Sequence, residues 1–573
     1  MKSESLRLNI TLAAILLLSS LILYRLFVIS YVRHSVYSRT AQAQNENISN
    51  VLVRGGIYLD DPSAQGSGSY LAATNKKFPL AYVVPLDVAD ERNDEIAAKL
   101  SEILSLDRGE IQSILNTNQK SSKILARRLS QEQFEKIRVL NTKGVNLKYE
   151  ADRFYPGNAQ AANVLGYFGN SSQGKAGQYG IELFYQDELA GQKTAGSDGI
   201  SLVSEVKQLF GQEKEEAATI TRPADIYLTI DKNVQVMVEQ KLDELIKKWS
   251  GAGGTIIVQD PTTGKILAMA DRPTFDPNIY SQAEPRSFLN RSVQEEFEPG
   301  SSFKPITMAM GLDLGKITPQ TTFTDEGSVT IGGYTIKNFS ERIFGTITMS
   351  QVLEKSVNTG TMHVQKLVGD EQFLNYAVNM GFGQRTGIDL PGEINGDITN
   401  LYSGRKINYL TASFGQGIAV TPLQLINAYS AIANGGKLMR PYIVQKIARE
   451  GGGETVIQPE VVSIPIAQKT AQKVAGMLVN VVDNGFDKAR IEGYDVAGKT
   501  GTAQIPDGKG GYLEDEFIHD FVGFAPAYNP KFTILIKLDK PKGITFAADS
   551  LSPTFRDISK YLLTYYNIPP TRR

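Results

Sequence analysis

The chain has no cysteine in its 573 residues, which excludes disulfides, thiolate metal sites, cysteine nucleophiles and a lipoprotein-type cysteine anchor. Histidine is scarce: His34, His363 and His519 are the only three. A histidine-rich metal site is therefore not expected, and any Ser-His-Asp triad must use one of these residues. The net charge of −1 gives no general attraction to nucleic acid. Other side chains must carry the chemistry.

The composition is that of an ordinary globular protein, and one long apolar run lies near the N-terminus. Residues 8–31 read LNITLAAILLLSSLILYRLFVISY. About 20 helical residues cross a hydrocarbon core of roughly 30 Å, so this run predicts a single transmembrane anchor. A cleaved signal peptide is the alternative, because residues 41–43 (AQA) look like a cleavage site, but charged residues separate them from the apolar run. The flanking positive charges are nearly balanced and leave the orientation open.

The length allows two to four domains of about 150 residues. The pattern of apolar and polar residues changes near Ala224. Before this point, apolar residues recur at helical spacing between residues 87 and 139. Residues 191–225 lack such periodicity, include a charged run, and predict a hairpin or linker. We therefore place a domain boundary at residues 223/224.

Beyond the boundary, strand patterns lie at both ends and helical patterns lie between them. The predicted strands cover residues 226–230, 254–260, 265–271 and 532–538, and the predicted helices include residues 234–249 and 555–565. This order predicts an antiparallel sheet assembled from both ends of the domain and layered with helices, and it does not suggest a βαβ series.

The first motif that could carry chemistry is PGSSFKP at residues 299–305. Proline is tolerated mainly in the first turn of a helix, so Pro305 predicts a helix that begins at about Ser301. A serine at a helix N-terminus, with Lys304 one turn along on the same face, is a known substitute for a Ser-His pair. An ordinary capped amphipathic helix is the alternative.

The second motif, KSVNTG at residues 355–360, lies between two helical patterns. It is either a polar connection that ends in a glycine cap or a segment that presents a second hydroxyl, Ser356, and an amide, Asn358, to a cleft.

The third motif is VAGKTGTA at residues 496–503. Residues 493–500 fit the phosphate-loop pattern, but the glycines and the proline that follow would not continue as the helix that such a loop requires. A strand that presents Lys499, Thr500 and Thr502 to an anionic substrate is the preferred interpretation, and a plain edge strand with a solvated lysine is the alternative.

Taken together and in this order, Ser301-x-x-Lys304, Ser356-x-Asn358 and Lys499-Thr500-Gly501 resemble the active-site motifs of penicillin-binding proteins and serine β-lactamases. The resemblance to class B penicillin-binding proteins, the monofunctional peptidoglycan transpeptidases, extends over nearly the whole chain. It includes the stretches LTIDKNVQ, DPTTGKILAMADRPTFDPN, EPGSSFKPIT, ASFGQGIAVTPLQLINAYSAIANGG and FVGFAPAYNP, and in the smaller domain RGGIY, RFYP and GIE. One departure is that Leu59-Asp60-Asp61 replaces the usual turn of this class.

The resemblance implies an α+β protein with a cytoplasmic N-terminus (1–7), a transmembrane anchor (8–31), an elongated pedestal of the dimerisation type (32–223) and a transpeptidase domain (224–573). The transpeptidase domain is expected to have the penicillin-binding, β-lactamase-like fold, in which helices flank an antiparallel sheet beside an all-α subdomain. The bulk of the chain would then lie outside the cytoplasmic membrane.

The resemblance also implies a role for each motif residue. Ser301 would attack the carbonyl between the terminal D-alanines of a stem peptide, with Lys304 as its base. Ser356 would relay a proton to the leaving amine, and Asn358 would hold the acylated peptide. The residues expected to bind the substrate carboxylate or form the oxyanion hole are Lys499, Thr500, Gly501 and Thr502.

No metal or cofactor is implied. The expected ligands are stem peptides ending in D-Ala-D-Ala and β-lactam antibiotics, and the expected partners are a membrane glycosyltransferase and division or elongation proteins. A septal role is favoured over elongation by the single anchor and compact pedestal. The alternatives are a D,D-carboxypeptidase, a β-lactamase, and a non-catalytic β-lactam sensor or division scaffold.

Overall fold

The computed structural model describes most of the chain after residue 53. The described residues are Ser19, 54–63, 68–88, 92–117, 120–171, 174–191, 222–449, 451–508 and 511–572. The predicted anchor (8–31) and the predicted linker (191–225) lie largely outside these ranges. No helix among the described residues has the length and apolar character needed to span a membrane. The chain forms two compact units, and the smaller one includes the described residues between Asn75 and Arg153.

The smaller unit is built on three helices, as the helical spacing predicted. They are α3 (Asn93–Leu104), α4 (Arg108–Leu115) and α5 (Gln131–Leu140), and their apolar faces share one core. A short strand, β3 (Lys123–Ala126), interrupts this helical region and pairs with the end of β2 (Ser69–Val83). A strand of this length shows no periodicity that could distinguish it from a loop, so the sequence did not reveal it.

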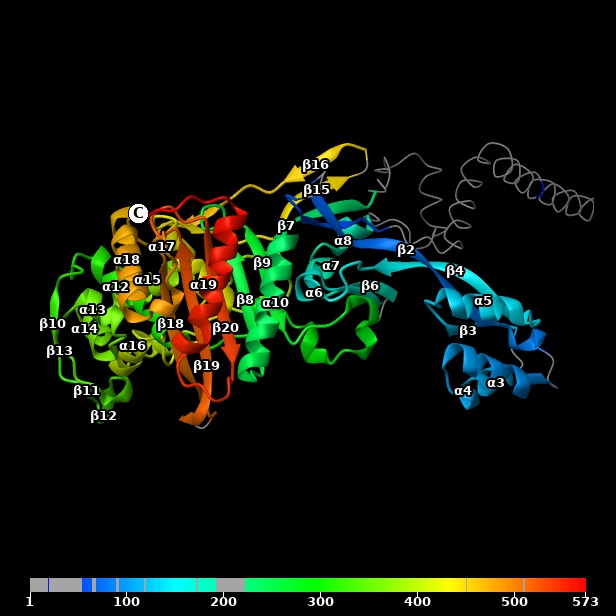
Figure 1. The fold of residues 1–573 in the computed structure, drawn as a ribbon, viewed down its shortest axis with the longest axis horizontal. Helices are drawn as coiled ribbons and strands as arrows, with labels where there is room; N and C mark the ends of the chain where they lie inside the picture. The colour runs from blue at the N-terminus through cyan, green and yellow to red at the C-terminus, as the bar shows by residue number, and fades with distance from the viewer. Residues whose placement is uncertain are drawn as a thin grey trace, which may run out of the picture. The chain divides into compact units, whose positions relative to one another are not determined.

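The larger unit contains the predicted antiparallel sheet. Figure 1 shows its strands side by side, and they come from both ends of this part of the chain. Their order is β18 (Ala497–Pro506), β19 (Tyr512–Ala525), β20 (Phe532–Asp539), β8 (Gly253–Gln259) and β9 (Ile266–Arg272). All neighbouring pairs are antiparallel, so the expected sheet is confirmed.

Helices cover both faces of this sheet, because successive strand residues point to opposite sides and both sets are apolar. On β20, for example, Ile534 and Ile536 belong to one core cluster and Leu535 to another. The first cluster includes α10 (Lys232–Trp249) and α19 (Ala547–Tyr565). The second includes α12 (Lys304–Asp313), α17 (Pro422–Ala433) and α18 (Gln468–Asn480).

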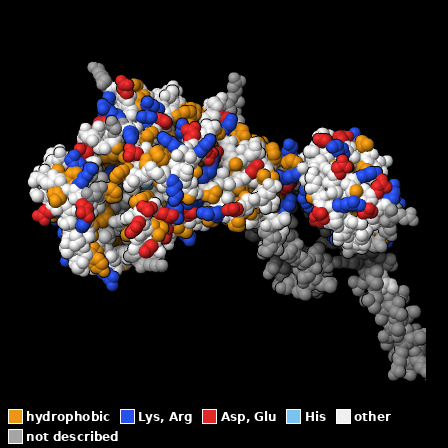
Figure 2. All heavy atoms as spheres, turned by 60° about the horizontal axis from the view of Figure 1, so that its bottom comes forward, with side chains coloured by type: hydrophobic (Ala, Val, Ile, Leu, Met, Phe, Trp, Pro, Cys, Tyr) orange, Lys and Arg blue, Asp and Glu red, His pale blue; other side chains and the backbone are white. Residues whose placement is uncertain are grey.

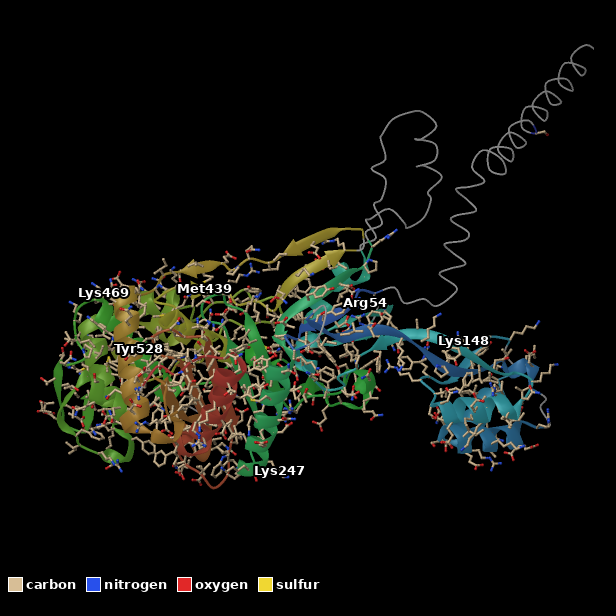
Figure 3. All side chains as sticks on the ribbon, turned by 45° about the horizontal axis from the view of Figure 1, so that its top comes forward. Arg54, Lys148, Lys247, Met439, Lys469 and Tyr528 are labelled. Atoms are coloured by element: carbon tan, nitrogen blue, oxygen red, sulfur yellow. The ribbon has the colours of Figure 1, made fainter. Side chains whose placement is uncertain are left out.

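The ends of α10 follow from its terminal residues. The Asp231 carboxylate accepts hydrogen bonds from the backbone N–H groups of Asn233 and Val234, which caps the N-terminus. Lys247 lies in the last turn, where a cation interacts favourably with the helix dipole (Figure 3). At the other end of the domain, α19 begins at Ala547, eight residues before the predicted start at 555, and contains Pro553.

A second sheet in the larger unit joins segments from three parts of the chain. The strand predicted at residues 226–230 is β7 (Ala224–Asp231), which pairs in parallel with β1 (Ile57–Asp60). Its other neighbour is β15 (Val444–Arg449), which pairs in turn with β16 (Gly453–Val456). Residues on both sides of Ala224 therefore belong to one sheet.

Charge on the surface is mixed in sign. In Figure 2, the described Lys and Arg side chains on the visible face are interspersed with Asp and Glu. This pattern agrees with the net charge of −1, and this face has no broad basic field of the kind that binds nucleic acid.

Candidate active site

Ser301 lies in a tight turn that leads into α12. A 3-10 turn covers Gly300–Phe303, and the α-helix itself begins at Lys304, three residues after the predicted start at Ser301. The backbone N–H of Lys304 donates to the Ser301 carbonyl, which closes the 3-10 turn. Side chains three residues apart are eclipsed in this geometry, so the turn directs Ser301 and Lys304 to the same side.

Several contacts hold this turn in place from outside. The N–H of Gly300, which has a φ of 55°, donates to the Gly415 carbonyl at 3.0 Å. The Ser302 hydroxyl donates to the Pro299 carbonyl at 2.8 Å, and the Tyr429 hydroxyl donates to the Ser302 carbonyl at 2.7 Å. Ser301 is thus placed by a turn whose neighbouring polar groups are already bonded.

Lys304 is completely buried, with 0% of its surface exposed. Its Nζ donates to the Ser356 carbonyl at 2.5 Å and lies 3.1 Å from Ser356 Oγ. Burial lowers the pKa of Lys304 well below its ordinary value, and the positive charge of Lys499 lowers it further. Both effects favour the neutral form of the amine, whose lone pair can accept a proton.

Ser356 lies between two helices in a rare backbone conformation. Its φ is 56°, a left-handed value that costs a residue other than glycine about 1 kcal/mol or more. It follows α13 (Met349–Glu354) and precedes α14 (Asn358–Val368). Strain of this kind persists where the surroundings impose it, and here it places the Ser356 hydroxyl against the two buried lysines.

The glycine cap considered for the second motif is not what the structure shows. Gly360 lies inside α14, where a Cβ would be only 2.5 Å from Val352 Cγ1. The absence of a side chain therefore lets α14 pack closely against α13. Asn358 opens α14, and its side-chain amide donates to the Lys337 carbonyl at 3.1 Å.

Lys499 lies on β18, the edge strand of the five-stranded sheet, as the strand interpretation of the third motif predicted. It is not a solvated lysine, because only 1% of its surface is exposed. Its Nζ donates to Ser356 Oγ at 3.2 Å and to the Thr500 carbonyl at 3.1 Å. Burial lowers the pKa of Lys499 to about 8, and the carboxyl of Asp520 opposes this shift.

Gly501 allows β18 to approach the serine turn. A Cβ at this position would lie 2.4 Å from the Pro299 carbonyl oxygen, so no other residue fits without movement. Next to it, the Thr502 hydroxyl accepts a hydrogen bond from the N–H of Ala547, which ties the strand to the start of α19.

The motif residues meet around one cleft of about 290 Å³. Five of the predicted site residues line it: Ser301, Ser356, Asn358, Thr500 and Thr502. Lys304 and Lys499 lie beneath its floor and meet at the Ser356 hydroxyl. The structure therefore brings together segments about 50 and 200 residues apart in the chain, which the sequence alone could not place in contact.

Sequence reasoning missed the rest of the cleft wall. Phe339 and Phe546 pack edge to face, with ring centroids 5.3 Å apart. The other missed lining residues are Asn338, Arg342, Phe344, Phe414, Gln416, Gln504 and Phe517. These residues come from loops, a short 3-10 helix (Phe339–Glu341) and the strands β18 and β19, with no common spacing. The nearest sequence signal was the ASFGQGIAV stretch, which contains Phe414 and Gln416.

Histidine does not enter this cleft from the described part of the chain. His519 is buried, with Nδ1 2.8 Å from Ser550 Oγ and Nε2 3.1 Å from the Thr545 carbonyl. Burial lowers its pKa to about 4. No group of three His, Asp or Glu side chains among the described residues is arranged to hold a metal ion. The chemistry available in the cleft is that of hydroxyls, amines and amides.

Comparison with known proteins agrees with this geometry. Residues 254–560 match the family model described as the penicillin binding protein transpeptidase domain. The chain belongs to the penicillin-binding protein family. Residues 53–219 match the penicillin-binding protein dimerisation domain. The resemblance drawn from the three motifs is confirmed, and the chain is an enzyme of the serine-type transpeptidase class.

Individual relatives of this penicillin-binding protein cover most of its length. Stage V sporulation protein D of Bacillus subtilis is 33% identical over 513 residues, which span 87% of this chain and 77% of that protein. The peptidoglycan D,D-transpeptidase FtsI homolog of Mesostigma viride is 29% identical over 96% of this chain and 94% of its own. The crystal structure of penicillin binding protein 3 from Mycobacterium tuberculosis, complexed with aztreonam, superposes with a TM-score of 0.65. It has 30% sequence identity and covers 74% of this chain and 92% of its own.

Proposed function

We propose that this penicillin-binding protein is a membrane-anchored peptidoglycan D,D-transpeptidase that forms peptide crosslinks through an acyl-enzyme on Ser301. The observation that carries the proposal is the fully buried amine of Lys304, one turn after Ser301 and in contact with Ser356 below a cleft, where its surroundings lower its pKa. Acyl transfer needs a hydroxyl nucleophile, a base and a proton route to the leaving group, and these residues supply them.

In the first step, Ser301 Oγ forms a bond to the carbonyl carbon of the penultimate D-alanine of the donor stem peptide, and its proton passes to Lys304. The bond from that carbon to the nitrogen of the terminal D-alanine then breaks. The leaving nitrogen takes a proton through Ser356, which contacts both lysines, and free D-alanine departs. Backbone N–H groups of Ser301 and Thr502 would stabilise the oxyanion, each contributing on the order of 2.7–4 kcal/mol to lowering the barrier.

In the second step, an amine of another stem peptide attacks the ester carbon, the bond to Ser301 Oγ breaks, and the serine recovers its proton. Lys499 and the hydroxyls of Thr500 and Thr502 bind the terminal carboxylate of the donor. The positive charge of Lys499 and the position of the half-buried Thr500 and Thr502 on the wall of the cleft support this assignment. A β-lactam would be opened by the same serine and would remain attached.

The protein would be held in the cytoplasmic membrane by residues 8–31, with the catalytic domain outside the cell. We place it in septal wall synthesis, together with a membrane glycosyltransferase and division proteins. The single predicted anchor and the compact pedestal expected from the sequence support this choice. Depletion should block septation and leave side-wall growth intact, whereas loss of cell shape would favour an elongation role.

The direct test is labelling with a fluorescent penicillin, followed by mass mapping of the adduct. The wild-type protein should carry one label on Ser301, and Ser301→Ala should carry none. Ser281→Ala, at an exposed serine away from the cleft, is the matched control and should label normally. An unlabelled wild-type protein, or a labelled Ser301→Ala variant, would overturn the acyl-enzyme proposal.

Product analysis then separates the transpeptidase from a D,D-carboxypeptidase. With a donor stem peptide and an acceptor amine, the proposed enzyme releases D-alanine and forms a crosslinked dimer. Release of D-alanine without any dimer, whether or not the acceptor is present, would indicate the carboxypeptidase. Rapid turnover of penicillin would indicate a β-lactamase.

A further inference from the structure

A buried carboxyl, Asp520, lies directly behind the active-site strand. In the β18–β19 ladder Asp520 is opposite Gly501, and in the β19–β20 ladder it is opposite Lys537. A Cβ on Gly501 would lie 2.1 Å from Asp520 Oδ2 and 2.4 Å from the Pro299 carbonyl oxygen. The carboxyl therefore occupies the space behind Gly501, against the backbone of the serine turn.

Asp520 is in an environment that disfavours a charge. Its surface is 0% exposed, and neither carboxyl oxygen has a hydrogen bond of normal geometry. The nearby Ser302 hydroxyl donates instead to the Pro299 carbonyl. Burial raises the pKa of Asp520 to about 7, while Ser302, Lys499 and Lys537 offset part of that rise. Because a buried carboxyl without partners destabilises a fold, its presence here requires an explanation.

The charged and titratable groups that face Asp520 come from each element packed around it. Lys537 on β20 is bonded to Asp539, which already neutralises it. Tyr429 on α17 is fully buried, and its hydroxyl donates to the Ser302 carbonyl. Lys499 on β18 has no described carboxylate within salt-bridge distance, since its Nζ contacts Ser356 and the Thr500 carbonyl. Lys499 is therefore the cation whose protonated form the Asp520 charge favours, against the effect of burial.

The charge of Lys499 in turn affects Lys304, the proposed catalytic base. A negative Asp520 favours the protonated form of Lys499, because opposite charges stabilise each other in a buried site. A protonated Lys499 in turn disfavours a second positive charge on Lys304. With Asp520 negative, Lys499 positive and Lys304 neutral, the three groups carry no net charge and each lysine has the form that acyl transfer requires.

We propose that Asp520 is a positioning residue for acyl transfer that acts through Lys499: its carboxylate keeps Lys499 protonated to hold the substrate carboxylate, and Lys304 therefore remains a free base. The inference rests on the proposed function of the cleft. It assigns no contact between Asp520 and substrate, since Gly501 lies between them.

The test uses Asp520→Asn, which keeps the shape and removes the charge. The rate of acylation by a fluorescent penicillin is measured across the neutral and alkaline range, roughly pH 6 to 10. Lys499 without its countercharge loses its proton more readily, so the alkaline limb of the profile should move to lower pH, by on the order of one pH unit. Asp520→Asn should also melt at a higher temperature than the wild type above pH 7, because burial disfavours the Asp520 carboxylate more than the nearby lysines favour it.

The control is Asp271→Asn. Asp271 is a fully buried carboxyl in the same sheet, on β9 at the opposite edge, and it accepts hydrogen bonds from Thr255 and Ser292. Replacement of Asp271 should lower the melting temperature. It should not change the pH at which the acylation rate falls on the alkaline side. The two variants are thus expected to separate the charge effect from general damage to the sheet.

The inference would be overturned if the acylation rate of Asp520→Asn depended on pH in the same way as that of the wild type, apart from a constant factor. An Asp520→Asn chain that melts earlier or fails to fold would also overturn it, since the carboxyl would then be a structural partner. Asp520→Ser, also neutral, should reproduce the shifted limb. If the wild-type protein itself is not acylated, the proposed function fails, and this result is distinct from an unshifted limb in an active enzyme.

Discussion

The lysines at the cleft and those in the smaller unit differ in burial and in ion pairing. In the smaller unit, Lys99 lies 2.5 Å from Glu95 and Lys136 lies 2.6 Å from Glu132, and at least half of each side chain is exposed. In the cleft, Lys304 and Lys499 are 0% and 1% exposed, and neither forms a salt bridge with a described carboxylate.

The difference shows that the location of a charge, rather than its presence, marks the working part of this protein. Exposed helix pairs remain ionised whether or not the chain is folded, so they add little to stability and cannot perform acid–base chemistry near neutral pH. Burial removes water from a lysine amine, which disfavours its protonated form and lowers its pKa. The fold is less stable for this reason, but it contains amines that can exchange protons.

The largest effect should come from Lys304→Met, which removes the base and roughly preserves its volume. Acylation by penicillin should slow by about 10²–10⁴-fold, measured by stopped-flow or gel-based labelling. The melting temperature at neutral pH should not fall. Folding lowers the pKa of Lys304, which costs stability at pH values below its ordinary pKa, and methionine removes this penalty.

Lys355→Met provides the matched control, since Lys355 also lines the cleft but remains partly exposed beside Glu354. A Lys304→Met protein that acylates at the wild-type rate would show that burial of this amine has no catalytic purpose. Burial of lysines would then not distinguish the active site from the smaller unit in function.

An intermediate effect is expected for Gly501→Ala, which tests whether close packing or charge governs the cleft. The new methyl group would meet the Pro299 carbonyl and Asp520, forcing β18 away from the serine turn. A displacement near 1 Å should slow acylation by up to about 10²-fold, and overpacking should lower the free energy of unfolding by about 1–3 kcal/mol. Urea denaturation and labelling rates measure the two effects; wild-type values in both would contradict the packing argument.

The smallest effect should come from Lys99→Ala in the smaller unit. The pair that Lys99 forms with Glu95 is exposed to solvent, so neither the melting temperature nor the acylation rate should change measurably. A clear loss of labelling would mean that the smaller unit influences the cleft through its surface charges. Calorimetry on the same preparation would show whether such a loss reflects unfolding.

Much of the secondary structure could be predicted from the sequence because its residues repeat with the period of the element. Val234 and Leu245 recur on one face of α10, and the apolar run at 532–538 is β20. Elements of only four residues escaped prediction, as β3 and the 3-10 turn at Ser301 show. The boundary at Ala224 stays a prediction, although β7 begins at this residue.

The site could be predicted in its parts but not in its arrangement. Ser301, Lys304, Ser356 and Lys499 are recognisable by their neighbours in the chain, whereas Phe339, Phe546 and Asp520 belong to no motif. The left-handed conformation of Ser356 is equally invisible in the sequence, because serine usually avoids it.

By itself, the sequence determined which chemical groups this protein has: a serine before a helix, two lysines, a second serine, and no cysteine. Local spacing was enough for this, because a turn or a strand depends mainly on adjacent residues. Only the tertiary structure decided which of these groups are charged. The pKa of an amine depends on burial and on charges that reach it through space, and Lys304, Lys499 and Asp520 come from three elements that meet only in the folded chain.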